Sequence, residues 1–150
     1  MTTSVDYNDL ASQLQGQFGQ GFTPAEDYVE VPCAFIAKAA EYMKNTLGFD
    51  YLGMVTAADY ADHFEVIYQL QSIKTNSSAL LKVRCPKDKP FVPSLANLWL
   101  GASLQEREVY DLFGIEFTEH PHLKRIVLWD GFKGYPLRKD FKGKAYGASD

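Results

Sequence analysis

The stretch FEVIYQLQSIKTNSSALLKVRC, residues 64–85, indicates the main architecture of this 150-residue chain. Its first part alternates apolar side chains with more polar ones, and the apolar set is Phe64, Val66, Tyr68 and Leu70. The polar run KTNSS follows, and the alternation then resumes with Leu81, Val83 and Cys85 around Lys82 and Arg84. A period of two with a polar turn is typical of antiparallel strands with one covered and one partly wet face. Residues 64–85 therefore predict two adjacent antiparallel strands.

The segments before this stretch extend the same layer. FDYLGMVTA, residues 49–57, and the turn ADYAD predict a third strand, so that the three strands form a meander. Residues 33–47 place apolar side chains on one helical face, and Gly48 follows at the end. A further helix is expected over residues 5–18, and a short strand is expected over DYVEVP. These elements predict a small two-layer α+β domain, mainly an antiparallel sheet packed with helices.

The second half of the chain contains shorter expected elements. LANLWL predicts a short helix that breaks near Gly101, and a second helix is expected to begin at Ser103 and to close at Gly114. GIEF and RIVLW are expected to be strands, and the tail after them, rich in glycine and basic residues, is expected to be irregular. We therefore expect a domain over residues 1–128 and an extended tail over residues 129–150.

Composition excludes several function classes. The formal net charge is −4 and the isoelectric point is about 5.3, so the chain lacks the basic character of nucleic-acid-binding domains. No apolar run approaches the roughly 20 residues that a membrane-spanning helix needs. The N-terminus shows no secretory signal, so any membrane association is expected to come through a partner.

Cofactor-binding residues are scarce. The only two cysteines, Cys33 and Cys85, are too few for a structural zinc site or a four-cysteine iron–sulfur cluster. His120 and His122 have no neighbouring cysteine or third histidine that would complete a metal site. The sequence therefore predicts no catalytic residues, no metal site and no bound cofactor in this chain.

Four charged residues lie within the expected helix of residues 103–113. Ser103 and Glu106 have the S-x-x-E spacing of a capping box, and Arg107 and Asp111 have the i, i+4 spacing of an ion pair. Glu108 is either a solvated residue or an acid at a protein interface. A helical wheel finds no purely apolar face, which suits a helix packed between its own domain and a partner. A catalytic carboxylate cluster is less favoured because no nucleophile–base pair accompanies the acids.

The longer motif EREVYDLFGIEFTEHPHLKRIVL, residues 106–128, resembles the C-subunit (30 kDa) family of respiratory complex I, the NADH-quinone oxidoreductases. In cyanobacteria and plastids the corresponding protein is called the J subunit. The family pattern has an E-R-E triplet, an acid, a fixed gap to His-Pro, and then basic and aliphatic residues. PKDKPFVPSLANLWLGA before the motif and GYPLRKDF after it also look like family segments. Relatives often carry glycine before His-Pro, where this chain has Glu119, so the turn is expected to differ locally.

The resemblance implies a non-catalytic structural protein in the hydrophilic arm of a proton-pumping translocase. Such a protein packs on the D subunit, which lines the quinone cavity, and lies near the B subunit, which holds the terminal iron–sulfur cluster. It is peripheral to the energy-transducing membrane on its cytoplasmic face. It carries no cofactor of its own, whereas the complex uses NADH or another donor, iron–sulfur clusters and quinone. The alternative is the equivalent subunit of an energy-converting hydrogenase or of a ferredoxin- or F(420)H(2)-linked dehydrogenase.

The expected partner interface combines the motif with the tail. The tail segment GYPLRKDF has an apolar Tyr-Pro-Leu step beside charged residues, a composition suited to docking on a neighbouring subunit. We expect residues 129–141 to become ordered there. The expected interface residues are Arg107, Glu108, Asp111, His120, Arg125, Tyr135, Arg138 and Asp140.

Overall fold

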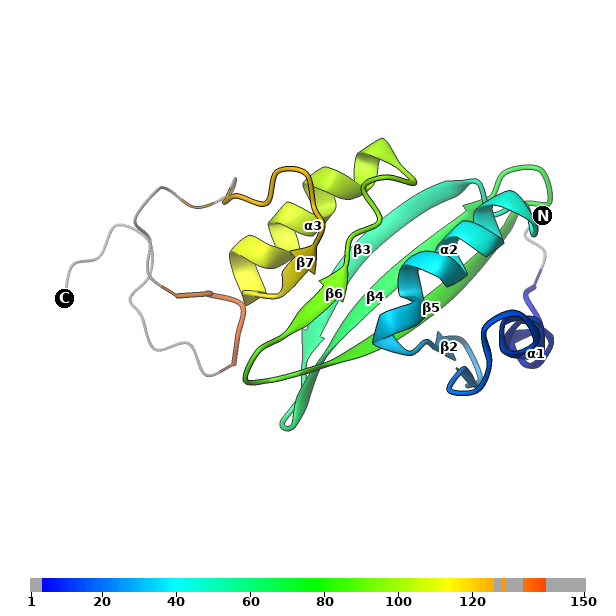
Figure 1. Ribbon diagram of the computed structural model, residues 1–150, viewed down its shortest axis with the longest axis horizontal. Coiled ribbons are helices and arrows are strands. Elements are labelled where there is room, and N and C mark those ends of the chain that lie inside the picture. Colours follow the sequence, from blue (N-terminus) through cyan, green and yellow to red (C-terminus); the bar gives the residue numbers. More distant parts are fainter. Residues whose placement is uncertain (1–3, 126–127, 129–133, 140–150) are drawn as a thin grey trace.

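The fold is built on a five-stranded mixed sheet with the strand order β1-β2-β5-β4-β3. The computed structural model describes residues 4–125, 128 and 134–139 (Figure 1). The central meander consists of β3 (Tyr51–Asp59), β4 (His63–Ser72) and β5 (Ser77–Pro86), with β4 antiparallel to both of the others. The strands β1 (Thr23–Pro24) and β2 (Val29–Glu30) complete the sheet, and β2 runs parallel to β5. The predicted α+β class and the meander are confirmed.

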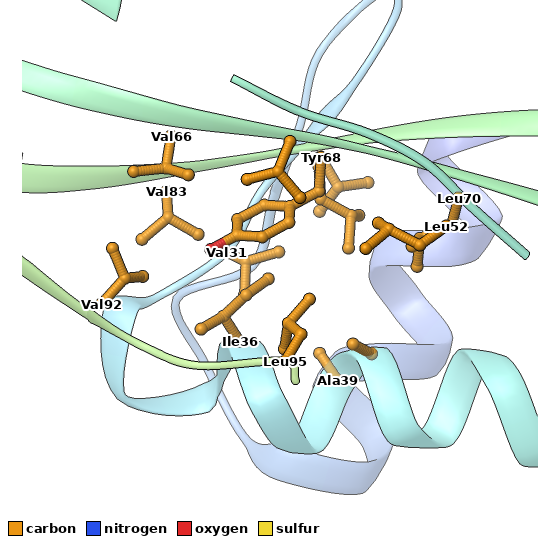
Figure 2. Packing of buried hydrophobic residues seen from close by; sticks show 14 of the residues in the cluster. Val31, Ile36, Ala39, Leu52, Val66, Tyr68, Leu70, Val83, Val92 and Leu95 are labelled. Carbon is orange, nitrogen blue, oxygen red and sulfur yellow. The ribbon is translucent and has the colours of Figure 1, made fainter. Parts of the chain in front are cut away.

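Register gives the sheet one apolar face. Tyr68 of β4 pairs with Val55 of β3 and with Leu81 of β5, and all three side chains are buried. Within each strand, the residues next to these in sequence point to the opposite face of the sheet and are more polar, as expected for a period of two. Figure 2 shows the apolar side chains of the sheet facing Ile36 and Ala39 of the helix that covers them.

Two helices complete the first half of the domain. The helix α1 (Tyr7–Phe18) begins where the Asp6 side chain accepts a hydrogen bond from the Asp9 N–H, and it ends at Gly19. Its Tyr7 hydroxyl accepts a hydrogen bond from the Leu80 N–H. A short 3-10 turn, η1 (Cys33–Phe35), leads into α2 (Ile36–Asn45), which lies across the sheet (Figure 1). Both helices were predicted, with ends that differ by a few residues at most.

The second half differs from the sequence prediction in two ways. The strand β6 (Phe91–Pro93) lies within the segment PKDKPFVPS and was not predicted. It pairs in parallel with β7 (Glu116–Thr118). The expected short helix over residues 95–100 is wrong, because residues 96–98 form a turn and one helix, α3 (Leu100–Phe113), follows directly. The predicted strand at GIEF is confirmed by β7, whereas most of RIVLW lies outside the described residues.

Tertiary contacts of Trp99 explain why α3 begins early. The indole N–H of Trp99 donates to the Asp50 carbonyl at 3.0 Å, and the Lys44 ammonium lies 5.4 Å from a Trp99 ring centroid. These contacts hold Trp99 in an extended conformation, so the helix starts at the next residue.

Among the described residues, no helix is long and apolar enough to cross a membrane.

Candidate functional site

Glu106 is a fully buried acid of α3, and the predicted capping box is wrong. The helix begins at Leu100, so Ser103 and Glu106 both lie inside it, and no side chain caps its N-terminus. Glu106 has 0% exposure and points to the loop after β6. Its carboxylate accepts hydrogen bonds from the Ser94 hydroxyl at 2.6 Å and from the Leu95 N–H at 2.7 Å. Glu106 therefore fixes the β6–α3 connection instead of a helix end.

Burial is the dominant influence on the Glu106 carboxyl group. Desolvation raises its pKa from the ordinary 4.5 to about 7, although the hydrogen bonds from Leu95 and Ser94 act in the opposite direction. A raised carboxyl pKa in a cleft would suggest acid–base catalysis. Here the carboxyl group has no exposure to a ligand, so the shift reflects a structural position.

His120 lies beside Glu106 and was expected at a partner interface. Its Nδ1 accepts the His122 N–H at 2.9 Å, so Nε2 carries the ring proton and donates to the Ser103 carbonyl at 3.1 Å. The ring is therefore neutral in this arrangement, and its 3.8 Å separation from Glu106 is not an ion pair. The His120 side chain has no exposure, so the structure gives it a place inside the chain instead of at the surface.

The turn that places His120 keeps the conformation expected of glycine. Glu119 has a φ of +62°, in the left-handed region. The expectation that this turn differs from that of relatives with glycine stays a prediction, although its positive φ is one that glycine adopts readily. The chain adopts a positive φ with a non-glycine residue, at the cost of some backbone strain.

Asp111 is the second fully buried acid of α3. Its Oδ1 lies 3.3 Å from the Arg125 Nε, and its Oδ2 accepts the Leu128 N–H at 3.0 Å. The predicted pair between Arg107 and Asp111 is wrong, because Arg107 donates its Nε–H to the Lys124 carbonyl. An exposed i, i+4 pair contributes only about 0.2–0.5 kcal/mol, so the buried contact with Arg125 determines where Asp111 points.

The described part of the tail contacts the domain itself. The Leu137 N–H donates to the Leu112 carbonyl at 3.0 Å, and the Arg138 Nε–H donates to the Phe113 carbonyl. The Arg138 guanidinium also lies 5.0 Å from the ring centroid of Tyr135. Residues 134–139 therefore cover the C-terminal end of α3, whereas Asp140 lies outside the described residues. The prediction that residues 129–141 dock on a partner stays a prediction.

Asp59 anchors the far end of this tail segment and was not singled out from the sequence. Its carboxylate accepts the Lys139 N–H at 2.7 Å and pairs with Lys87. Burial raises the Asp59 pKa, but the hydrogen bonds from Lys87 and Lys139 outweigh it, and the net pKa is lowered. An aspartate at a strand end gives no sequence signal for a contact 80 residues away.

Gly114 is a point of close approach between α3 and the tail. It has a φ of +77°, and an added Cβ would lie 2.7 Å from the Tyr135 ring and 2.8 Å from Arg138. We expect Gly114→Ala to destabilise the domain by about 1–3 kcal/mol, through backbone strain and displacement of the tail turn. Urea denaturation measures this free energy of unfolding.

Gly101 of the same helix provides the matched control. An added Cβ there meets nothing within 4 Å, and its φ is not positive. Gly101→Ala is therefore expected to stabilise the protein by about 0.5–1 kcal/mol. Equal effects of the two substitutions would contradict the described tail contact.

Two of the expected interface residues lie on the surface of α3 or beside it. Glu108 is exposed, and Arg107 is half-buried with its side chain directed to Lys124. Tyr135 and Arg138 are half-buried against the domain, and Arg125 lies against Tyr135. Among the residues described, no three His, Cys, Asp or Glu side chains are grouped to hold a metal ion. Among the expected interface residues of the motif, the structure thus buries the side chains of Asp111 and His120 and leaves Glu108 exposed.

Comparison with known proteins places this arrangement in a family. Residues 29–147 match the model of the family described as the 30 Kd subunit of the respiratory-chain NADH dehydrogenase. The C subunit of a Moorella thermoacetica NADH-quinone oxidoreductase is 41% identical over 75% of this chain and 77% of the relative. The C subunit of a Methanosarcina mazei F(420)H(2) dehydrogenase is 35% identical over 93% of this chain and 94% of the relative.

A solved structure has a chain with a similar fold. A chain in the structure of the membrane-bound sulfane sulfur reductase, an archaeal respiratory membrane complex, superposes with a TM-score of 0.72. It is 26% identical, and the match covers 90% of this chain and 85% of that one. These similar proteins are parts of multi-subunit complexes, and their names agree with the sequence motif. The chain belongs to the family of the 30 Kd subunit of the respiratory-chain NADH dehydrogenase, which includes the C subunits of NADH-quinone oxidoreductases.

Proposed function

We propose that this chain is a non-catalytic structural component of the hydrophilic arm of a proton-pumping NADH-quinone oxidoreductase. In this proposal it packs on the D subunit, which lines the quinone cavity, and lies near the B subunit, which holds the terminal iron–sulfur cluster. It is peripheral to the energy-transducing membrane, on the cytoplasmic face. The donor, the clusters and the quinone are bound by other subunits.

The burial of two acids of α3, Glu106 and Asp111, is the observation that carries this proposal. Glu106 and Asp111 have no exposure, and each binds groups of its own chain. His120 of the same motif is also buried, and its ring binds the Ser103 carbonyl. An enzyme needs convergent titratable groups that a substrate can reach. The side chains of Glu106, Asp111 and His120 have no exposure, so a substrate cannot reach them. The motif is therefore better suited to building a rigid domain than to catalysing a reaction.

The second candidate is the equivalent subunit of a complex with a different electron donor. The specific observation in its favour is the length match with the Methanosarcina mazei relative, which aligns over more than nine-tenths of both chains. The printed name of that relative specifies an F(420)H(2) dehydrogenase. Donor oxidation by the isolated membrane complex distinguishes the two candidates, since NADH supports activity in the first and reduced F(420) or ferredoxin in the second.

The purified chain tests the structural role directly. We expect it to be colourless and to oxidise neither NADH nor reduced F(420), because Cys33 and Cys85 are the only cysteines for cluster ligation. Visible absorption spectroscopy and donor-oxidation assays provide the measurement. An iron–sulfur spectrum, or donor oxidation that persists after removal of adventitious metal, would overturn the proposal.

A further inference from the structure

The N-terminal half of α3 carries an apolar surface that the domain leaves uncovered. Leu100 is 94% exposed and Leu104 is 57% exposed, although most large apolar side chains of the described residues are buried. Residues four apart on a helix lie one above the other, so the two leucines form a continuous stripe that leads to Glu108. We call Leu100, Leu104 and Glu108 the α3 stripe. All three residues are exposed.

The described part of the chain contacts the C-terminal half of the outer surface of α3 more than the N-terminal half. At its C-terminal end, Leu137 and Arg138 donate hydrogen bonds to the carbonyls of Leu112 and Phe113. At its middle, Arg107 binds the Lys124 carbonyl. Figure 1 shows the first turns of α3 at the edge of the molecule, beyond the segment that follows β7. The described part of the chain therefore covers the C-terminal half of α3 and leaves the leucines of the stripe at the surface.

The charges at the two ends of the stripe specify the partner chemistry. Among the described residues, no side chain caps the N-terminus of α3, and the first turn of α3 has no acidic residue, so this end has a partial positive charge. The Glu108 carboxylate lies about 12 Å further along the helix. A complementary surface presents an acidic or carbonyl group, then apolar side chains, then a lysine or arginine. Such a surface supplies the missing cap and neutralises Glu108 while it covers both leucines.

We propose that the α3 stripe is the docking surface for a neighbouring subunit whose contacting face presents acidic, apolar and basic groups in that order. This inference rests on the proposed function, which supplies a multi-subunit complex for the chain to join. The net charge of −4 disfavours a second copy of this chain and favours a face that carries basic groups. The leucines give the central apolar contact, and the surrounding charges set the register.

Leu104→Arg in the affinity-tagged full chain, expressed in place of the wild-type protein, is the principal test. Arginine at this exposed position should leave the melting temperature of the purified chain within a few degrees of wild type. Recovery of the membrane complex with the tagged chain should fall by about tenfold or more, the loss expected when a central interface residue is replaced by a charge. Glu108→Lys should weaken recovery as well.

Ile73→Arg is the matched control, because Ile73 is also a large apolar side chain, 73% exposed, but lies in the turn between β4 and β5. We expect it to assemble normally. Normal assembly of Leu104→Arg, or equal losses for Leu104→Arg and Ile73→Arg, would overturn the assignment of the docking surface. If the wild-type chain recovers no respiratory complex, the proposed function fails instead.

A photo-crosslinking amino acid at position 104 gives a second readout that does not depend on disruption. In the assembled complex it should form an adduct with one neighbouring subunit, and the crosslinked peptide of that neighbour should contain a lysine or arginine. An adduct with a second copy of this chain, or no adduct in a complex that contains the chain, would contradict the proposal. This test also decides the matter if Leu104→Arg fails to fold.

Discussion

Asp111→Ala is expected to lower the free energy of unfolding by about 3–5 kcal/mol, which is more than we expect for Glu106→Ala or Gly114→Ala. The Asp111 carboxylate has no exposure, pairs with Arg125 and accepts the Leu128 N–H. Alanine would leave the Arg125 guanidinium, whose side chain is only 16% exposed, without this countercharge. Removing one partner of a buried pair costs more than the pair itself contributes, because the charge that remains has been desolvated on folding.

Glu108→Ala is the matched control for Asp111→Ala. Glu108 belongs to the same helix but is exposed, so its replacement should change the free energy of unfolding by no more than about 0.5 kcal/mol. Urea denaturation followed by circular dichroism measures both variants. A cost below about 1 kcal/mol for Asp111→Ala would show that the segment after β7 is not held by this carboxylate.

Glu106→Ala should destabilise the domain by about 2–4 kcal/mol at pH 5. The substitution leaves a cavity beside β6 and deprives the buried Leu95 N–H of its acceptor. The Ser94 hydroxyl loses the same partner, so the connection between β6 and α3 is no longer fixed. Glu106→Gln retains an acceptor oxygen of similar shape and is expected to be much less harmful than alanine at this pH.

The pH dependence of stability distinguishes a buried Glu106 carboxyl group that titrates from a neutral side chain at the same position. The Glu106 pKa is about 7 in the folded chain and near the ordinary 4.5 when unfolded, so the folded state binds the proton more tightly. Stability should therefore fall as the pH rises from about 4.5 to about 7, by a total of about 3 kcal/mol. Glu106→Gln should lack this component, whereas contributions from Asp59 and His63 remain in both proteins. Parallel stability profiles for wild type and Glu106→Gln would contradict the buried carboxyl assignment.

The central meander of the sheet could be predicted from the sequence because its signal is local. Alternation in residues 64–85 indicates directly which side chains of β4 and β5 face the helices, and the observed pairing keeps these side chains on one face. The strand β6 escaped prediction because it has only three residues, and its partner β7 lies more than twenty residues further along the chain. A strand that short is stabilised by its tertiary surroundings and gives no periodicity of its own.

The charged residues of α3 were identified from the sequence, but their roles depended on contacts that the sequence does not show. Ser103 and Glu106 matched a capping pattern, yet Trp99 fixes an earlier start through Asp50 and Lys44. Glu106 consequently faces the connection after β6 instead of a helix end. The wheel without an apolar face predicted that α3 packs between its own domain and a partner, and the partner contact stays a prediction. Described residues between 120 and 139 of the same chain also contact α3.

The exposed leucines of α3 were missed for a related reason. The sequence predicts Leu100 in a separate short helix, which does not align it with Leu104 and Glu108. In the single helix α3 the three residues align, and the interface that we propose lies on the N-terminal half of this helix. Of the buried members of the expected set, His120 binds the Ser103 carbonyl in the N-terminal half of α3, whereas Asp111 holds the segment after β7.

Co-purification is the measurement that tests the central claim most directly. The full chain, affinity-tagged and expressed at its natural level, is isolated from membranes in mild detergent, and the proteins recovered with it are identified by mass spectrometry. If the chain is a structural component of a complex of the NADH-quinone oxidoreductase type, the quinone-cavity and terminal iron–sulfur subunits should accompany it in equal amounts. The recovered assembly should reduce quinone, whereas the chain alone should not. Recovery of the chain by itself, or with proteins unrelated to quinone reduction, would contradict the account.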